Sequence, residues 1–146
     1  MTTPTKIVTD RKILRQRSIR WDGTQEELDK LILKMKIAMV ENDGIGISAI
    51  QVGVPATIFI AHNICFINPK IKSRHPWEKR DWEGCLSCPG AHVKVKRSTK
   101  IEVEYTNHLG VLVNATFKDY AARVIQHEFD HLHGHLIIDK GKVYQE

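Results

Sequence analysis

Two histidines four residues apart, with a glutamate directly after the first, are the part of this sequence best suited to metal chemistry. They lie in QHEFDHLHG (126–134) as His127, Glu128 and His131. On a helix this spacing puts both side chains on one face, with Cβ atoms about 6 Å apart, where one divalent ion can bridge the imidazoles. Glu128 is then placed to handle the proton of a water molecule at the metal. The pattern alone leaves open a solvent-facing helix with two unrelated histidines.

A catalytic metal usually needs a third protein ligand and an open position. The metalloprotease pattern HExxHxxGxxH matches this chain only through Gly134, because its last histidine would fall on Ile137. His133 and His135 follow His131 too closely to reach the same ion. The third ligand is therefore expected upstream of the helix.

EGCLSCPG (83–90) is the obvious upstream supplier. Cys85 lies in a glycine-flanked, extended segment, where the backbone can approach a ligand closely, and a thiolate suits iron or zinc. Cys85 and Cys88 also form a CxxC pair, which leaves open a redox pair and a closed structural zinc site with two cysteines and two histidines. A closed site would leave Glu128 without a task.

A glycine-rich stretch, GIGISAIQ (44–51), ends in the amide donor Gln51. Its two glycines allow a tight backbone. A phosphate-binding loop is excluded, because the third glycine of the dinucleotide pattern is missing and the stretch follows a helix rather than a strand. By itself, Gln51 would be interpreted as a polar residue in a turn.

Two helices are predicted to frame these motifs. The first spans 24–42, where Thr24 and Glu27 form a capping box and an apolar face recurs at helical spacing. That face consists of Leu28, Leu31, Ile32, Met35, Ala38 and Met39. The second spans 117–133 and carries the histidines, with a capping box of Thr116 and Asp119 and a terminal Gly134.

Short β-rich runs between the helices predict antiparallel strands. They are expected at 54–61, at 64–69, in HVKVK (92–96), at 100–107 and at 111–117, with Pro69 ending the second and turns at His62-Asn63 and 107–110. The sequence thus predicts the α+β class: mostly antiparallel sheets around the central metal-binding HExxH helix, with an N-terminal helix. The length of 146 residues predicts one domain, 1–146.

Composition and charge exclude several function classes. The hydrophobic share of 42% and charged share of 27% are typical of soluble globular proteins. No apolar run approaches the roughly 18 residues of a membrane span, and MTTPTKIVTDRK is no signal peptide. We therefore expect a cytoplasmic protein whose three cysteines are thiols or metal ligands. The run VKVKRSTK (93–100) favours a strand with one wet face over a nucleic-acid patch.

Taken together, GIGISAIQ, EGCLS and QHEFDHLHG resemble, in order and in separation, the motifs of the peptide deformylases. The resemblance extends to TDRKILRQRS, the first helix and FINP, from about residue 6 to 139. It implies a hydrolase that removes the N-formyl group from the N-terminal formylmethionine of newly synthesised proteins and releases formate. Its partners would be N-formylmethionyl nascent peptides.

The resemblance also implies the residue roles. Cys85, His127 and His131 would bind one divalent metal, Fe(II) in the cell, which zinc, nickel or cobalt can replace. Glu128 would be the general acid and base, while Gln51 and the backbone N–H of Leu86 would stabilise the oxyanion. The implied substrate-binding residues are Gly44, Ile45, Gly46, Glu83, Gly84, Tyr120, Arg123 and Val124.

Some positions depart from the family pattern. Ile47 and Ser48 replace a leucine and an alanine, and His92 stands where many bacterial members carry arginine. Tyr120 and Arg123 stand where many relatives line the methionine pocket with apolar side chains. Either Arg123 extends along the rim with its charge in water, or the preference for residues near the substrate's amino terminus is altered.

The short end DKGKVYQE leaves no room for the long final helix with which bacterial enzymes dock on the ribosome. The chain is similar in this respect to short forms encoded by bacteriophages, which would act in the host cytoplasm. We expect at most weak ribosome contact, no direct nucleic-acid readout and no membrane contact. Two other function classes stay open: a zinc-dependent peptidase, which lacks a downstream ligand, and a non-catalytic metal-stabilised binding module, in which Glu128 and Gln51 would be idle.

Overall fold

The computed structural model describes residues 5–146. Its α-helices are α1 (Arg11–Leu14), α2 (Gln25–Glu41) and α3 (Asp119–Leu132), with 3-10 helices η1 (Ala49–Val52) and η2 (Ile137–Asp139). Its strands are β1 (Gly46–Ser48), β2 (Ile58–Ala61), β3 (Ile64–Arg74), β4 (Glu78–Cys85), β5 (Cys88–Ser98), β6 (Lys100–Thr106), β7 (Leu112–Lys118) and β8 (Val143–Gln145).

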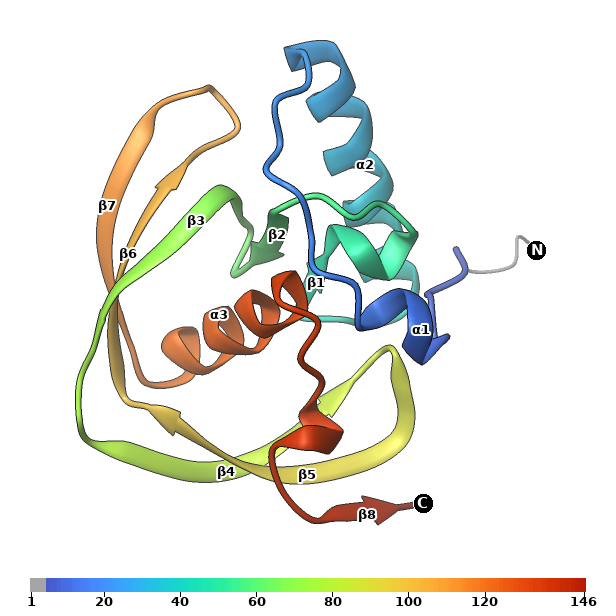
Figure 1. Cartoon of the computed structure of the whole chain (residues 1–146), viewed down its shortest axis with the longest axis vertical. Helices are drawn as coiled ribbons and strands as arrows, with labels where there is room; N and C mark the ends of the chain where they lie inside the picture. The colour runs from blue at the N-terminus through green and yellow to red at the C-terminus, as the bar shows by residue number, and fades with distance from the viewer. Residues whose placement is uncertain (1–4) are drawn as a thin grey trace.

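Among these residues the strands form a five-stranded sheet, β1-β2-β3-β6-β7, and a three-stranded sheet, β4-β5-β8. All named strand pairs are antiparallel. Figure 1 shows α3 between the two sheets, with α2 beside the β1 end of the larger one. The predicted α+β class with antiparallel sheets is confirmed.

Helix α2 forms as the local sequence predicts. Thr24 accepts a hydrogen bond from the backbone N–H of Glu27, whose carboxylate accepts one from the backbone N–H of Thr24 in return. All six residues of the predicted apolar face are buried, and they pack with β1, β2 and η1 in one core cluster. Asn42 caps the C-terminus. The helix therefore supports the strand that follows it in the sequence.

The larger sheet keeps the predicted turns but not all predicted bounds. His62 and Asn63 have φ of 49° and 60°, a left-handed pair that suits the tight turn between β2 and β3. Pro69 was expected to end its strand, yet β3 continues to Arg74. The register shifts between Ile67 and Lys70, so a bulge takes up the proline, which has no N–H to donate.

The smaller sheet contains the main strands that the sequence pattern missed. Strand β4 has the charged sequence EKRDWEGC, in which apolar and polar residues do not alternate. It forms because its backbone pairs with that of β5. The end of the chain adds β8 at the other side of β5, where Tyr144 pairs with His92. This sheet lies on the side of α3 opposite the larger sheet (Figure 1).

The start of α3 differs from the prediction. Lys118 is the N-cap and makes no side-chain capping bond, so the proposed capping box of Thr116 and Asp119 is wrong. Thr116 instead belongs to β7, where it pairs with Glu102 of β6. Ladder pairing therefore outweighs the local capping pattern. The helix ends at Leu132, and Gly134 follows with φ 74°, as its predicted place at the C-terminus requires.

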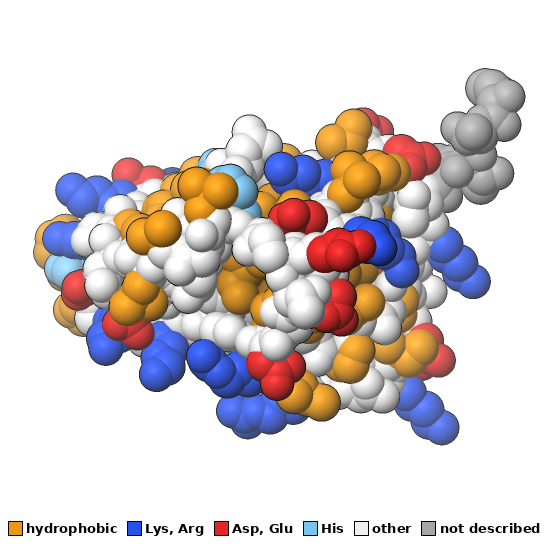
Figure 2. Space-filling view, turned by 90° about the horizontal axis from the view of Figure 1, so that it is seen from above, with side chains coloured by type: hydrophobic (Ala, Val, Ile, Leu, Met, Phe, Trp, Pro, Cys, Tyr) orange, Lys and Arg blue, Asp and Glu red, His pale blue; other side chains and the backbone are white. Residues whose placement is uncertain are grey.

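Apolar side chains fix the orientation of α3. Ala122, Ile125 and Leu132 pack with residues of β2, β3 and β6 in a second core cluster. This contact leaves the histidine face free to meet the smaller sheet. Seen from the end where α2 begins, acidic, basic and apolar side chains are mixed on the surface (Figure 2). No helix within residues 5–146 is long and apolar enough to cross a membrane.

Candidate metal centre

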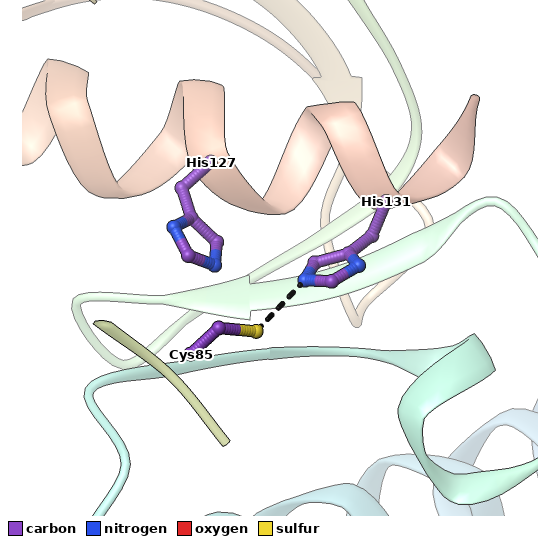
Figure 3. A group of neighbouring side chains, drawn as sticks. All are labelled: Cys85, His127 and His131. Atoms are coloured by element: carbon purple, nitrogen blue, oxygen red, sulfur yellow. Dashed lines mark hydrogen bonds between the residues drawn. The ribbon is translucent and has the colours of Figure 1, made fainter. Parts of the chain in front are cut away.

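The two histidines of α3 and one cysteine of β4 converge on a single point. His127 and His131 lie one turn apart, with ring centroids 5.3 Å apart, and both point toward Cys85 (Figure 3). The Cys85 Sγ lies 3.4 Å from the His131 Nε2. One ligand atom from each residue lies within 4.8 Å of the other two. The upstream cysteine thus completes the group that the helix begins.

The hairpin between β4 and β5 places Cys85. Cys85 pairs with Cys88 across the turn, and the β4–β5 register shifts between Glu83 and Cys85. Such a bulge re-aims the side chains that follow it. Cys88 is buried nearby but is not part of the three-residue group, so the four-ligand arrangement of a closed site is not formed.

Two features prepare the histidines to bind a metal. The His127 Nδ1 lies 2.9 Å from the Glu83 Oε1 and donates to it, so its Nε2 keeps a free lone pair. Burial lowers the pKa of His131 to about 3, and the positive charge of Arg97 acts in the same direction. His131 is therefore neutral, with a lone pair for a ligand.

Cys85 needs a cation to become a good ligand. A hydrogen bond with Cys88 and burial raise the pKa of the Cys85 thiol well above its usual range. A divalent ion bound among these three residues would stabilise the thiolate, because its positive charge offsets the negative charge on the sulfur. Two neutral imidazoles and one thiolate are donors that iron and zinc both accept. The donor set therefore fits one metal ion with an open position.

A buried ion-pair network holds His127 in place. Both oxygens of Glu83 accept hydrogen bonds from Arg97, at 3.0 Å each, and the Arg123 Nη1 donates to Oε2 at 2.7 Å. Burial alone would raise the pKa of Glu83, but the bonds from His127 and Arg97 outweigh it and hold the pKa well below its usual range. Arg97 also pairs with Asp130 on α3.

Arg123 corrects one expectation. Its side chain does not extend into water: it is 7% exposed and donates to the backbone carbonyls of Val95 and Lys79 as well as to Glu83. The Glu83 carboxylate is likewise occupied by its protein partners. Both residues line the pocket wall, and their polar atoms are hydrogen-bonded to protein partners.

Glu128 lies buried beside the candidate metal ligands. Its Oε1 accepts a hydrogen bond from the Ser48 hydroxyl at 3.1 Å. Burial raises the pKa of Glu128 to about 7, against the opposing effects of His127 and Ser48. A Cβ on Gly46 would lie 2.7 Å from the Glu128 Oε2, so only glycine leaves the carboxylate its room. Ser48, which stands where the family pattern has an alanine, therefore contacts Glu128 directly.

Gln51 is positioned by η1 and is fully buried. Its Oε1 accepts from the Ser48 N–H at 2.9 Å, which orients the amide group. Its Nε2 donates to the Ser87 Oγ at 3.0 Å and lies 3.7 Å from the Cys85 Sγ. Leu86, half-buried after Cys85, packs against the α2 core cluster. A donor amide thus faces the candidate centre.

A pocket of about 410 Å³ opens over this centre. His131 lies behind it, whereas the other predicted site residues line it: Gly44, Ile45, Gly46, Gln51, Glu83, Gly84, Cys85, Leu86, Tyr120, Arg123, Val124, His127 and Glu128. Trp82 and His92 line it too. Tyr120 is 56% exposed and meets the His62 ring edge-on, so it lies at the open side.

Arg97 is the main residue that the sequence analysis missed. It belongs to the run taken as a strand with a wet face, and its charge suggested an exposed position. Val93, Val95 and Arg97 are alternate residues of β5, so their side chains point to the same face of the strand. Both valines are buried, which places Arg97 on the inward face.

Comparisons with known proteins agree with this geometry. Residues 4–145 match the family model described as polypeptide deformylase. The chain is 41% identical over 132 residues to the peptide deformylase of Thermotoga maritima, covering 88% of this chain and 80% of that protein. It is 38% identical over 136 residues to peptide deformylase 1 of Clostridium perfringens, covering 89% of this chain and 92% of that one.

Solved structures show the same fold. The crystal structure of peptide deformylase from Thermotoga maritima superposes with a TM-score of 0.91 at 38% identity, covering 97% of this chain and 99% of that one. A probable peptide deformylase from the Synechococcus phage S-SSM7 superposes with a TM-score of 0.89 at 34% identity, covering 93% and 99%.

Proposed function

This chain belongs to the polypeptide deformylase family, and from that premise we propose how its own residues perform the reaction. The protein is a metal-dependent hydrolase that removes the N-formyl group from the N-terminal formylmethionine of newly synthesised proteins and releases formate. The observation that carries the residue assignment is the meeting of Cys85, His127 and His131 within 4.8 Å, beside the buried Glu128.

Cys85, His127 and His131 are the proposed ligands of one divalent ion. Fe(II) is the proposed ion in the cell, and zinc, nickel or cobalt can take its place, since this donor set accepts several first-row metals. When bound, the ion supplies positive charge that lowers the pKa of water and polarises the formyl oxygen. Glu83 supports the site by fixing the His127 tautomer.

Glu128 is the proposed acid and base. Its carboxylate takes a proton from the attacking water and passes it to the leaving amine. The Ser48 hydroxyl orients one oxygen, and Gly46 leaves space at the other. With a pKa raised to about 7, the carboxyl can both accept and return a proton near neutral pH.

Gln51 and the Leu86 backbone N–H are the proposed donors to the oxyanion. The bond from the Ser48 N–H to the Gln51 Oε1 leaves the Nε2 turned toward the centre. Because both donors are fixed before the reaction, little reorganisation is needed as charge develops. Loss of one such donor typically lowers kcat by about 10²–10³-fold.

The substrate is proposed to enter as an extended strand. β1 lies at the edge of the larger sheet and begins at Gly46, so its outer side can pair with a peptide backbone, and Gly44 and Ile45 line the pocket just before it. The methionine side chain then points into the pocket against Val124, with Tyr120 and Gly84 at its walls.

The setting of the reaction follows from its substrate. We place the protein, as one domain spanning 1–146, in the cytoplasm, or in the host cytoplasm for a phage-encoded form. Its partners are N-formylmethionyl nascent peptides, with weak ribosome contact, no base-specific nucleic-acid readout and no membrane contact.

Formate release from a short N-formylmethionyl peptide tests the proposal. Protein purified anaerobically with iron should release formate rapidly, and metal-free protein should not. Cys85→Ser should weaken or change metal binding, which mass spectrometry of the native protein would show. No release from folded, metal-loaded protein would contradict the function, and unchanged metal content in Cys85→Ser would contradict ligation.

A further inference from the structure

The outer face of the smaller sheet carries side chains that have no role in the mechanism proposed above. Val93 and Val95 of β5 point inward and are buried, so the alternate residues of the sheet point outward. The pairs Arg80–Lys96 and Trp82–Lys94 place one outward row across β4 and β5. The pair His92–Tyr144 extends the row to β8.

Two aromatic rings lie at the centre of this face. Trp82 is 51% exposed and Tyr144 is 50% exposed, and their ring centroids lie 5.2 Å apart in an edge-to-face arrangement. A lysine lies over each ring: the Lys94 Nζ is 5.9 Å from the centroid of the Trp82 ring, and the Lys142 Nζ is 5.4 Å from the centroid of the Tyr144 ring. Large exposed aromatic surface with a polar rim marks an interaction site.

Basic side chains outnumber acidic ones on this face: Arg80, Lys94, Lys96 and Lys142 against Glu78 and Glu146. The Lys96 Nζ lies 3.9 Å from the Glu78 Oε1, and the His92 Nε2 lies 2.7 Å from the Glu146 Oε1. Arg80, Lys94 and Lys142 have no acidic partner within 4.0 Å among residues 5–146. The face at the α2 end of the molecule, in contrast, mixes both signs (Figure 2). The sheet face therefore fits an anionic partner.

We propose that the outer face of β4-β5-β8 binds single-stranded RNA without base-specific readout, with Trp82 and Tyr144 stacking on bases and Arg80, Lys94, Lys96 and Lys142 contacting phosphates. Exposed aromatic rings interleaved with cations on a sheet are the features that single-stranded nucleic acid requires. An acidic peptide would match the cations but would leave the rings without flat partners. An anionic lipid surface would match the charge and would also accept Trp and Tyr rings at its interface, so vesicle binding is the competing outcome of the test.

The position of this face relates it to the known reaction. Trp82 and His92 also line the pocket, so bound RNA would lie beside the mouth through which a nascent chain enters. An exposed ribosomal RNA segment would supply this chemistry near a nascent chain. The RNA site itself does not depend on turnover, and its test is separate from formate release.

Fluorescence anisotropy with a short labelled oligoadenylate tests the site on the full, metal-loaded chain. Lys94→Gln/Lys142→Gln should weaken binding and reduce the salt slope by about 1.4, since each of the two lost phosphate contacts contributes about 0.7 for single strands. Lys34→Gln/Lys36→Gln, an equal charge change at exposed positions of α2, should leave binding unchanged. Equal weakening by both pairs would overturn the proposal.

The aromatic part has its own test. Trp82→Leu should weaken binding by about 5-fold or more with the salt slope unchanged, because stacking and not charge is lost. Trp82→Phe, which keeps a ring, should restore most of the affinity. No binding of the oligonucleotide at low salt, or binding only to phosphatidylserine vesicles, would overturn the RNA site, whatever the result of the formate assay.

Discussion

His127 donates from Nδ1 to the Oε1 of Glu83 across 2.9 Å, and this bond joins α3 to β4 at the centre of the molecule. It fixes the imidazole tautomer and directs the other nitrogen to the metal position. Arg97 and Arg123 hold the same carboxylate from the other side. The geometry of one ligand thus depends on residues of β4, β5 and α3 together.

Glu83→Gln should weaken metal binding by about 10–100-fold, because the amide cannot support His127 as a carboxylate does. Competition with a chelator, monitored by metal content, would give the affinity. Glu78→Gln makes the same chemical change at an exposed position of the same strand and should leave the affinity unchanged. A Glu83→Gln protein that is folded and binds metal as tightly as the parent would contradict the supporting role.

Arg123→Met should lower the free energy of unfolding by about 3–5 kcal/mol. The change removes one cation from the buried Glu83 and leaves two backbone carbonyls, of Val95 and Lys79, without this donor. Denaturant unfolding followed by circular dichroism measures the difference. Arg80→Met, on the outer face of the same sheet, is the control and should cost well under 1 kcal/mol. Similar losses of unfolding free energy in both variants would show that the buried ion-pair network contributes little to stability.

Local interactions explain which parts of the fold the sequence predicts. Helix α2 follows from its capping box and its apolar spacing, both contained within the helix itself. Strand β4 does not follow, since its residues are mostly charged and its partners come from β5. Thr116 shows the same limit, because a locally satisfactory cap gives way to pairing with a distant strand.

The site divides in the same way. The spacing of His127 and His131 implies that both bind one metal ion. No suitable third metal-binding residue follows them in the sequence, which points upstream to Cys85, and the structure places Cys85 next to both histidines. The burial of Arg97 depends on Glu83 and Asp130, which lie on two other elements. Ser48 becomes informative only when β1 and α3 lie together. These relationships join distant segments, so no short pattern contains them.

The ion pair between Arg15 and Asp139 should add stability that acid removes. The hydrogen bond from Arg15 is the largest effect, and it lowers the pKa of Asp139 from its usual value. Stabilisation from a lowered carboxyl pKa is complete above the unfolded value and is lost as the pH falls through the folded value. Because the pair is half-exposed, we expect at most about 1 kcal/mol.

Arg15→Gln measures that contribution. The parent should unfold with a higher free energy than the variant at neutral pH, and the difference should shrink as the pH falls below about 4. Arg11→Gln, the same substitution in α1, is the charge-matched control. A difference between parent and Arg15→Gln that stays constant across this pH range would exclude a contribution from Asp139 ionisation.

Glu128→Gln should keep the metal and lose nearly all turnover. The amide retains the size of the carboxyl and can still accept from the Ser48 hydroxyl, so the packing against Gly46 persists. It cannot take a proton from water, and loss of a general acid and base typically lowers the rate by about 10²–10⁴-fold. Metal content by mass spectrometry and formate release on the same sample separate binding from catalysis. Glu128→Ala should show the same loss of turnover with full metal content. Turnover within tenfold of the parent in either variant would contradict the role of Glu128 as acid and base.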